Sequence, residues 1–167
     1  KKYQKLNEQF AASIYKQAEH ALTQNQNPQA IEHFLRIVKL APNSTIRSTA
    51  QYDAIVQMVA ADQWKPATKQ LIDFRRRFPS NALNANTLQL LITAFQKQER
   101  WLEAANELVK LFKRSTDVKE KQATLFLAAQ TYEKAKQSDL AIQYYRQYAH
   151  AYPAPLDDAL ESRHKLE

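Results

Sequence analysis

The chain has 167 residues, a formal net charge of +7 and neither glycine nor cysteine. The lack of glycine argues against phosphate-binding loops, dinucleotide-binding turns and nucleophile elbows, whose backbones need a residue without a Cβ. The lack of cysteine excludes disulfides, thiolate zinc sites and cysteine nucleophiles. No apolar run in the sequence approaches the roughly 20 residues that span a bilayer. Good helix formers dominate the composition, so these properties favour one all-helical domain.

Apolar residues recur three and four positions apart along the chain, which predicts nine helices. In chain order the helices cover residues 3–24, 28–40, 45–61, 65–78, 82–98, 101–114, 117–136, 139–152 and 155–166. Asn27 and Ser138 are expected to cap the second and eighth helices, because their side chains can accept a backbone N–H. Pro42, Pro79 and Pro153 are expected to end helices, because proline cannot continue the hydrogen-bond ladder.

A repeat of 37 residues organises these helices. Each unit has an alanine at the same place, with bulky apolar residues four and seven positions later. The alanines are Ala30, Ala67, Ala104 and Ala141. Asn25 and Asp62 fall in the turn between paired helices, where both residue types tolerate a left-handed backbone. Gln51 is the one misfit in the apolar stripe of the first helices, so the pattern predicts four stacked helical hairpins.

The repeated alanines, bulky residues and prolines resemble the tetratricopeptide repeat over essentially the whole chain. The usual period of that repeat is about 34 residues, so three extra residues per unit must lie in the turn between repeats or lengthen a helix. The resemblance implies a right-handed α-solenoid that forms a single domain over residues 1–167. Its repeats are expected near residues 8–44, 45–81, 82–118 and 119–155, with a capping helix over residues 156–167.

The stretch from Ser138 onward is similar to bacterial cell-envelope tetratricopeptide proteins. These include the lipoprotein of the outer-membrane assembly machine and the periplasmic partner of the Tol-Pal system. The shared features are Tyr145, Tyr148 and the Tyr152–Pro153 pair, followed by an acidic, alanine-containing segment. This similarity implies a periplasmic or outer-membrane-associated protein. The sequence already reads as helix at its first residues, which suggests a piece of a longer protein.

The first helices of stacked hairpins line the concave face of a solenoid. The stripe one residue beyond their core stripe, with positions one turn earlier, therefore predicts a groove for a partner. Its residues are Tyr15, Glu19, Leu22, Tyr52, Val56, Asn86, Gln89, Thr93, Phe126 and Gln130. Rigid aromatic side chains are good anchors, but the same periodicity also allows Tyr15, Tyr52 and Phe126 to pack repeat against repeat. The groove lacks the cations with which some tetratricopeptide proteins grip a terminal carboxylate, so that clamp is not predicted.

Basic residues gather near the ends of the second helices. This basic stripe consists of Arg36, Lys39, Arg76, Arg77, Lys110, Lys113 and Arg114. The simpler interpretation is that the cations complement helix dipoles on a solvated face. The alternative is a surface for nucleic acid, anionic lipid or an acidic protein. Nucleic acid is disfavoured because no aromatic residues alternate with the cations.

No catalytic residue, metal site or cofactor is predicted. The four histidines include no pair at helical metal-ligand spacing, and no nucleophile motif surrounds any serine. The predicted function is a non-catalytic scaffold that binds a peptide or helix of another protein, in a bacterial cell-envelope setting. The alternatives are self-association within a longer repeat array, which would give a homo-oligomer, and polyanion binding through the basic stripe.

Overall fold

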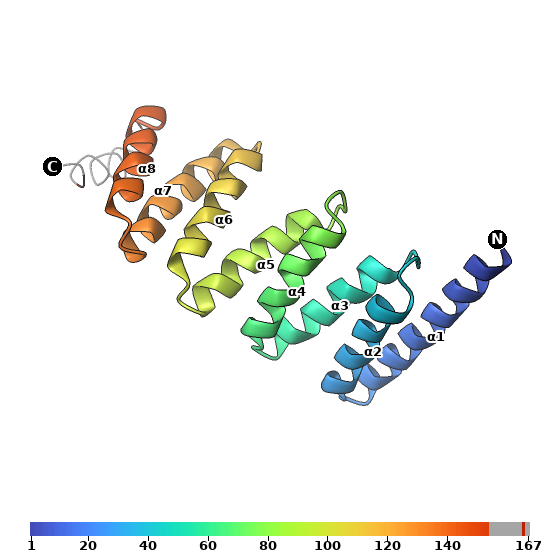
Figure 1. Ribbon diagram of the computed structural model, residues 1–167. Coiled ribbons are helices and arrows are strands. Elements are labelled where there is room, and N and C mark those ends of the chain that lie inside the picture. The colour runs from blue at the N-terminus through green and yellow to red at the C-terminus, as the bar shows by residue number, and fades with distance from the viewer. Residues whose placement is uncertain (154–164, 166–167) are drawn as a thin grey trace. The chain divides into compact units, whose positions relative to one another are not determined.

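The structure is a computed structural model that describes residues 1–153 and 165. These residues form eight α-helices and no strand, which confirms the prediction of an all-helical repeat fold (Figure 1). The helices are α1 (Lys2–Thr23), α2 (Asn27–Leu40), α3 (Arg47–Ala60), α4 (Trp64–Arg77), α5 (Asn84–Lys97), α6 (Trp101–Arg114), α7 (Val118–Lys134) and α8 (Ser138–Ala151). The predicted ninth helix over residues 155–166, and the cap over 156–167, lie outside the described residues.

The chain divides into two compact units, and each is described by itself. Unit 1 covers Lys1–Thr87 and unit 2 covers Leu88–Glu167, so the boundary falls within α5. In unit 1, α1 packs on α2, α2 on α3 and α3 on α4. In unit 2, α7 packs on both α6 and α8. The prediction of a single solenoid domain over residues 1–167 stays a prediction.

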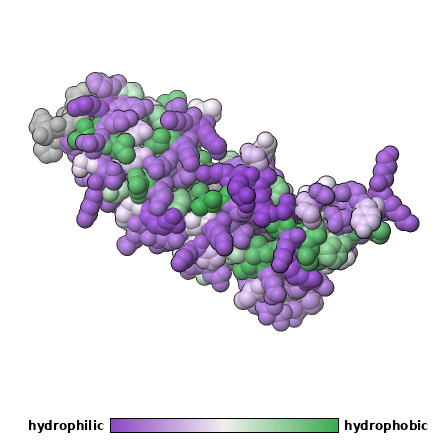
Figure 2. Space-filling view, in the orientation of Figure 1, coloured by the Kyte–Doolittle hydropathy of each residue, from purple (hydrophilic) through white to green (hydrophobic). Residues whose placement is uncertain are grey.

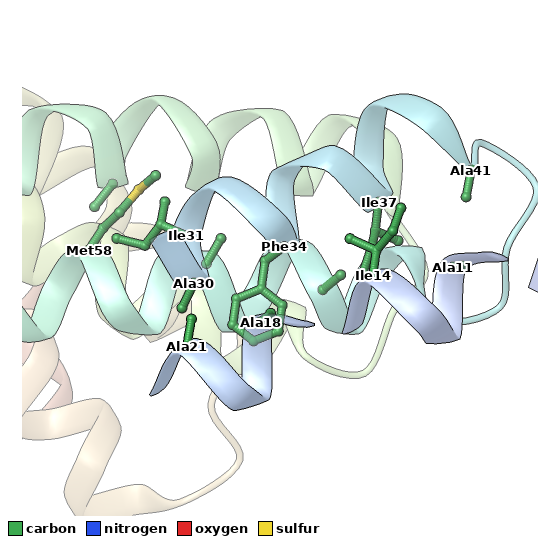
Figure 3. Packing of buried hydrophobic residues seen from close by; sticks show 13 residues of the cluster. Ala11, Ile14, Ala18, Ala21, Ala30, Ile31, Phe34, Ile37, Ala41 and Met58 are labelled. Carbon is green, nitrogen blue, oxygen red and sulfur yellow. The ribbon is translucent and has the colours of Figure 1, made fainter. Parts of the chain in front are cut away.

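Small residues at the helix contacts allow α1 and α2 to pack closely. Ala18 and Ala30 are completely buried and Ala21 is nearly so. Figure 3 shows the ring of Phe34 beside Ala18, with Ala21 next to Ala30. Because alanine lets the two backbones approach each other, the large ring of Phe34 is enclosed between the helices and is only 2% exposed. The spacing of alanine and bulky residues in the sequence thus reports the contact between paired helices.

A left-handed residue ends the first helix of every hairpin. The four residues, with φ between 55° and 58°, are Asn25, Asp62, Glu99 and Lys136. In each turn the next backbone N–H bonds to the carbonyl five residues back, as from Gln26 to Ala21 at 2.8 Å. This Schellman arrangement satisfies carbonyls at the helix end. The turns at Asn25 and Asp62 were predicted, whereas Glu99 and Lys136 adopt the same backbone with side chains that disfavour it.

The predicted side-chain caps at Asn27 and Ser138 are wrong. Helices α2 and α8 begin at these residues, and the preceding Gln26 and Gln137 cap them without any side-chain hydrogen bond. The reason is the tight turn. The residue that follows the left-handed position already occupies the N-cap position, so Asn27 and Ser138 fall inside their helices. Asn27 instead donates from Nδ2 to Oε1 of Gln57 at 2.9 Å, which ties α2 to α3.

The residues that lengthen the repeat lie in two different places. In unit 1, helices α3 and α4 have 14 residues each. The extra length lies in the turn that follows them, which covers residues 78–83. Before α7 the turn shrinks to residues 115–117, and α7 has 17 residues. Thr116 stands where the other repeats have proline, and Asp117 Oδ1 accepts the N–H of Glu120 at 2.7 Å. Without proline and with this cap, the helix extends toward its N-terminus.

Gln51 is fully buried although it is polar. Its Nε2 donates to Gln70 Oε1 at 3.0 Å and to Asp73 Oδ2 at 2.9 Å. Its Oε1 has no partner within the described residues. The equivalent residues of the other repeats, Ile14, Leu88 and Leu125, are apolar and buried. The misfit in the sequence is therefore a buried polar contact between α3 and α4 that the other hairpins replace with apolar packing.

Substitution of Glu99 by glycine is expected to stabilise the protein. The change Glu99→Gly removes the Cβ that makes the left-handed region costly and should raise the free energy of unfolding by about 0.5–1 kcal/mol. Lys97→Gly is the matched control, because Lys97 lies in the helical last turn of α5 and glycine there should cost about 0.5–1 kcal/mol. Urea denaturation measures both variants. Destabilisation by Glu99→Gly would contradict the strain argument.

Candidate protein-binding faces of the two units

Tyr15 and Asp53 join neighbouring first helices in unit 1. The Tyr15 ring lies edge-on against Phe34 of α2, with ring centroids 5.2 Å apart. Its hydroxyl donates to Asp53 Oδ2 of α3 at 2.5 Å. Burial and the hydrogen bond to Asp53 raise the pKa of Tyr15 to about 12. The side chain is half-buried, and its ring is held by Phe34 while its hydroxyl is held by Asp53.

Tyr52 repeats this arrangement one hairpin further along. Its ring lies edge-on against Phe74 of α4, with centroids 6.3 Å apart. Its hydroxyl accepts a long hydrogen bond of 3.4 Å from Nδ2 of Asn86, in the first turn of α5. Of the other predicted residues, Glu19 is exposed, Leu22 is half-buried against the core and Val56 is 39% exposed. We call Tyr15, Glu19, Leu22, Tyr52 and Val56 the first-helix face of unit 1.

In unit 2, Phe126 occupies the position equivalent to Tyr15 and Tyr52. Its ring lies 5.7 Å from the ring of Tyr145 and 5.0 Å from that of Tyr148, both on α8. Gln130 is half-buried one turn later on α7. Gln89 and Thr93 lie on α5, where the Thr93 hydroxyl donates to the carbonyl of Gln89 at 3.2 Å. Phe126 therefore contacts two aromatic rings of its hairpin, whereas Tyr15 and Tyr52 each contact one.

A polar contact beside Phe126 was not predicted from the sequence. The Tyr145 hydroxyl and the Lys165 ammonium both donate to Glu133 Oε2, at 2.7 and 2.8 Å. The bond from Lys165, followed by that from Tyr145, lowers the pKa of Glu133. Burial, followed by the bond to Glu133, raises the pKa of Tyr145 to about 12. The bond from Tyr15 to Asp53 was likewise not predicted, although Asp53 stands one repeat plus one residue after Tyr15, a spacing that places it on the adjacent first helix.

The predicted basic stripe lies toward the C-terminal ends of the second helices. Lys39, Arg76, Arg77, Lys113 and Arg114 all belong to last turns. Arg76 and Arg77 pair with Asp73 at 2.6 and 2.5 Å, and Lys110 pairs with Glu107 at 3.0 Å. Arg36 contacts His33 Nδ1 at 3.1 Å. This placement fits the helix-dipole interpretation for most of the stripe.

Two kinds of feature are absent from the described residues. Residues 1–153 and 165 contain no group of three or more histidine, aspartate or glutamate side chains that could hold a metal ion. None of the helices in this part of the chain combines the length and the apolar character that crossing a membrane requires. The space-filling view shows a largely hydrophilic surface, with apolar side chains gathered over the N-terminal helices (Figure 2).

Comparison with known proteins relates this geometry to a family. Residues 123–154 match the tetratricopeptide repeat family. The matched segment contains most of α7 and all of α8, and so includes Phe126 and its partners Tyr145 and Tyr148. Tetratricopeptide repeats generally mediate protein–protein interaction, and their fold is typically a non-catalytic scaffold. No curated protein sequence matches the chain.

Solved structures support the same fold over most of the chain. The crystal structure of the nearly identical TPR-like repeats of a predicted kinesin light chain from Podosopora anserina is 17% identical, with a TM-score of 0.52. A single-substitution variant of that protein is 18% identical, with the same TM-score. Each match covers 93% of this chain and 82% of the other. At such low identity the likeness shows the helical repeat fold alone, and it does not support the bacterial cell-envelope subtype.

Removal of the Tyr15 hydroxyl is expected to weaken the contact between α1 and α3. Tyr15→Phe keeps the ring against Phe34 but breaks the bond to Asp53, which should cost about 1 kcal/mol of unfolding free energy at pH 8. The raised pKa of Tyr15 means that its contribution is complete below pH 10 and disappears as the pH rises through about 12. Chemical denaturation at several pH values should therefore show the gap between wild type and variant narrowing above pH 10.

Tyr52→Phe is the matched control for this measurement. It removes a hydroxyl whose partner is an uncharged amide 3.4 Å away, so its loss at pH 8 should be smaller than that of Tyr15→Phe. If the two variants lose equal amounts of unfolding free energy, the Tyr15–Asp53 bond stabilises the contact between α1 and α3 no more than a hydrogen bond to an uncharged amide would.

Proposed function

We propose that the chain is a non-catalytic scaffold and that the first-helix face of unit 1 binds a peptide or helix of another protein. The proposal rests on the way in which Tyr15 and Tyr52 are each held at both the ring and the hydroxyl. Each ring is fixed edge-on by an aromatic residue of its second helix, while each hydroxyl is oriented by a polar group. Side chains that are already ordered lose little conformational entropy when a partner binds.

The chemistry of this face indicates what kind of segment it would accept. Val56 offers an exposed aliphatic surface one turn from Tyr52, and Leu22 lies half-buried at the far end of α1. Glu19 provides an exposed carboxylate between Tyr15 and Leu22. A segment with apolar residues beside a lysine or arginine would therefore complement the face. In unit 2 we propose that Gln89, Thr93, Phe126 and Gln130 provide a second contact surface.

A cell-envelope setting is a narrower part of the proposal. It rests on the similarity of the stretch from Ser138 onward to bacterial cell-envelope tetratricopeptide proteins. The partner would then be an envelope protein, and the chain would lie in the periplasm or at the outer membrane. Cell fractionation followed by immunoblotting of the full-length protein tests this location independently of any binding measurement.

Substitution of Val56 is expected to weaken partner binding without unfolding the chain. Val56→Arg places a bulky cation on the first-helix face at a position that is already 39% exposed, so stability should change by less than about 0.5 kcal/mol. Peptides selected from a random display library against the wild-type chain serve as probes. Calorimetry should show that the variant binds them at least about tenfold more weakly, a loss of about 1.4 kcal/mol.

Ile72→Arg is the matched control. Ile72 is an aliphatic residue of α4 with 49% exposure, and it lies on a second helix, outside the proposed face. The Ile72→Arg variant should bind the selected peptides with an affinity within about twofold of that of the wild-type chain. If Ile72→Arg loses binding and Val56→Arg retains it, partners bind to the second helices and the proposed face is wrong.

A second candidate function is self-association through the N-terminal part of α1. Tyr3, Leu6 and Phe10 are 90%, 55% and 44% exposed, and their spacing of three and four residues places them on one side of the helix. The same part of α1 is held to the turn after α2, because Glu8 accepts the backbone N–H of Thr45 at 2.7 Å. The helix therefore presents an exposed apolar stripe, a feature typical of surfaces that associate with another chain.

Light scattering over a range of concentrations tests self-association. The wild-type chain should increase in mean mass with concentration, and Leu6→Glu should remain monomeric because it places a charge in the centre of the stripe. A wild-type chain that stays monomeric at every concentration would remove this candidate and leave the scaffold proposal untouched.

A further inference from the structure

A groove between α2, α3 and α4 of unit 1 collects cationic side chains from all three helices. Its volume is about 400 Å³, and Lys39, Arg47 and Arg77 line it together with the apolar side chains of Leu35 and Val38. Arg47 stands outside the basic stripe that the sequence predicted, because it begins α3 instead of ending a second helix. The fold therefore adds a cation from a first helix to the cations of two second helices.

Asp73 is the one carboxylate among the residues that line the groove, and it already accepts hydrogen bonds from neighbouring side chains. Asp73 accepts hydrogen bonds from Arg76 at 2.6 Å, from Arg77 at 2.5 Å and from Gln51 at 2.9 Å. Burial raises the pKa of Asp73, but the bonds from Arg76, Gln51 and Arg77 outweigh it and lower the pKa overall. A single negative charge is thus shared between two arginines, and the groove as a whole keeps a positive excess.

Arg47 is held in place by neutral acceptors. Its Nε donates to the carbonyl of Val38 at 2.9 Å and its Nη1 donates to the carbonyl of Pro42 at 3.4 Å. Burial and the nearby charge of Arg77 lower the pKa of Arg47. Among the described residues, neither Arg47 nor Lys39 forms an ion pair with a carboxylate. The half-buried guanidinium therefore keeps donors for an external anion, and its orientation is already fixed.

We propose that this groove binds a phosphate or carboxylate group on an acidic peptide segment of a partner protein. The planar fork of Arg47 suits the paired oxygens of such a group, and Lys39 and Arg77 add charge from either side. Leu35 and Val38 accept an apolar residue next to the anionic one. Nucleic acid fits less well, because the groove offers no aromatic side chain on which a base could stack.

Fluorescence polarisation of labelled peptides tests the site. The probes are a peptide with one phosphoserine between leucine and valine, its analogue with glutamate, its unmodified form with serine, and an RNA oligonucleotide of similar length. The full chain should bind the phosphoserine and glutamate peptides more tightly than the serine peptide and the RNA. Arg47→Gln should weaken the binding of both anionic peptides by about tenfold, because the charge-assisted fork is lost.

Two further variants separate this site from general electrostatics. Arg114→Gln removes the same charge from the basic stripe of unit 2 and should leave peptide affinity within about twofold. Lys39→Gln changes an exposed side chain and should lower the affinity by about threefold, which keeps the test decisive if Arg47→Gln proves unstable in a thermal melt. Equal losses for Arg114→Gln and Lys39→Gln, tighter binding of the RNA, or no preference for the anionic peptides would each overturn the proposal.

Val56→Arg distinguishes the groove from the first-helix face. It should leave the affinity for the phosphoserine peptide unchanged while it weakens binding of the library-selected peptides at least about tenfold. If Val56→Arg weakens binding of the phosphoserine peptide as well as that of the selected peptides, the anionic peptide binds to the first-helix face. That result would overturn the groove as a separate site.

Discussion

The close approach of paired helices at alanine positions is the constraint on which the rest of each unit depends. Ala18, Ala21 and Ala30 bring two backbones together, and the ring of Phe34 is buried beside them. That placement leaves a defined edge against which Tyr15 packs. A larger residue at any of these alanines would separate the helices and remove the support of the surface aromatic, so the core packing also determines the geometry of the candidate binding face.

The aromatic residues of the first helices show why periodicity alone could not assign them. A helical pattern describes which way a Cβ points, but a tyrosine is long enough to bury one ring edge and leave its hydroxyl at the surface. Tyr15 and Tyr52 each pack the ring against an aromatic residue and direct the hydroxyl to a polar side chain of the next first helix, whereas Phe126 has no hydroxyl and contacts two tyrosines of α8. The structure thus shows packing against the second helix for all three aromatic residues, and the groove role of the two tyrosines stays a proposal.

Local features were predictable because neighbouring residues determine them. The helix boundaries, the turn at Asn25 and the apolar stripes follow from spacing and from residue types that tolerate particular backbone angles. The Tyr15–Asp53 bond and the position of Arg47 were not, because they depend on how one hairpin sits on the next. Gln51 was recognised as a misfit, but its partners on α4 could be found only when α3 and α4 were placed side by side.

Helix α3 connects the two proposed binding sites of unit 1. Tyr52 belongs to the first-helix face, and the adjacent Gln51 donates to Asp73 on the other side of the helix, where Asp73 orients Arg77 toward the basic groove. Both sites consist of side chains that packing and hydrogen bonds already hold, and neither requires a loop to become ordered. A ligand at one site changes the affinity of the other site only if it binds two conformations of the protein with different affinities. Because contacts on both sides hold α3 in one conformation, we expect partners at the two sites to bind independently. Unit 1 would then hold a basic and an acidic segment at the same time.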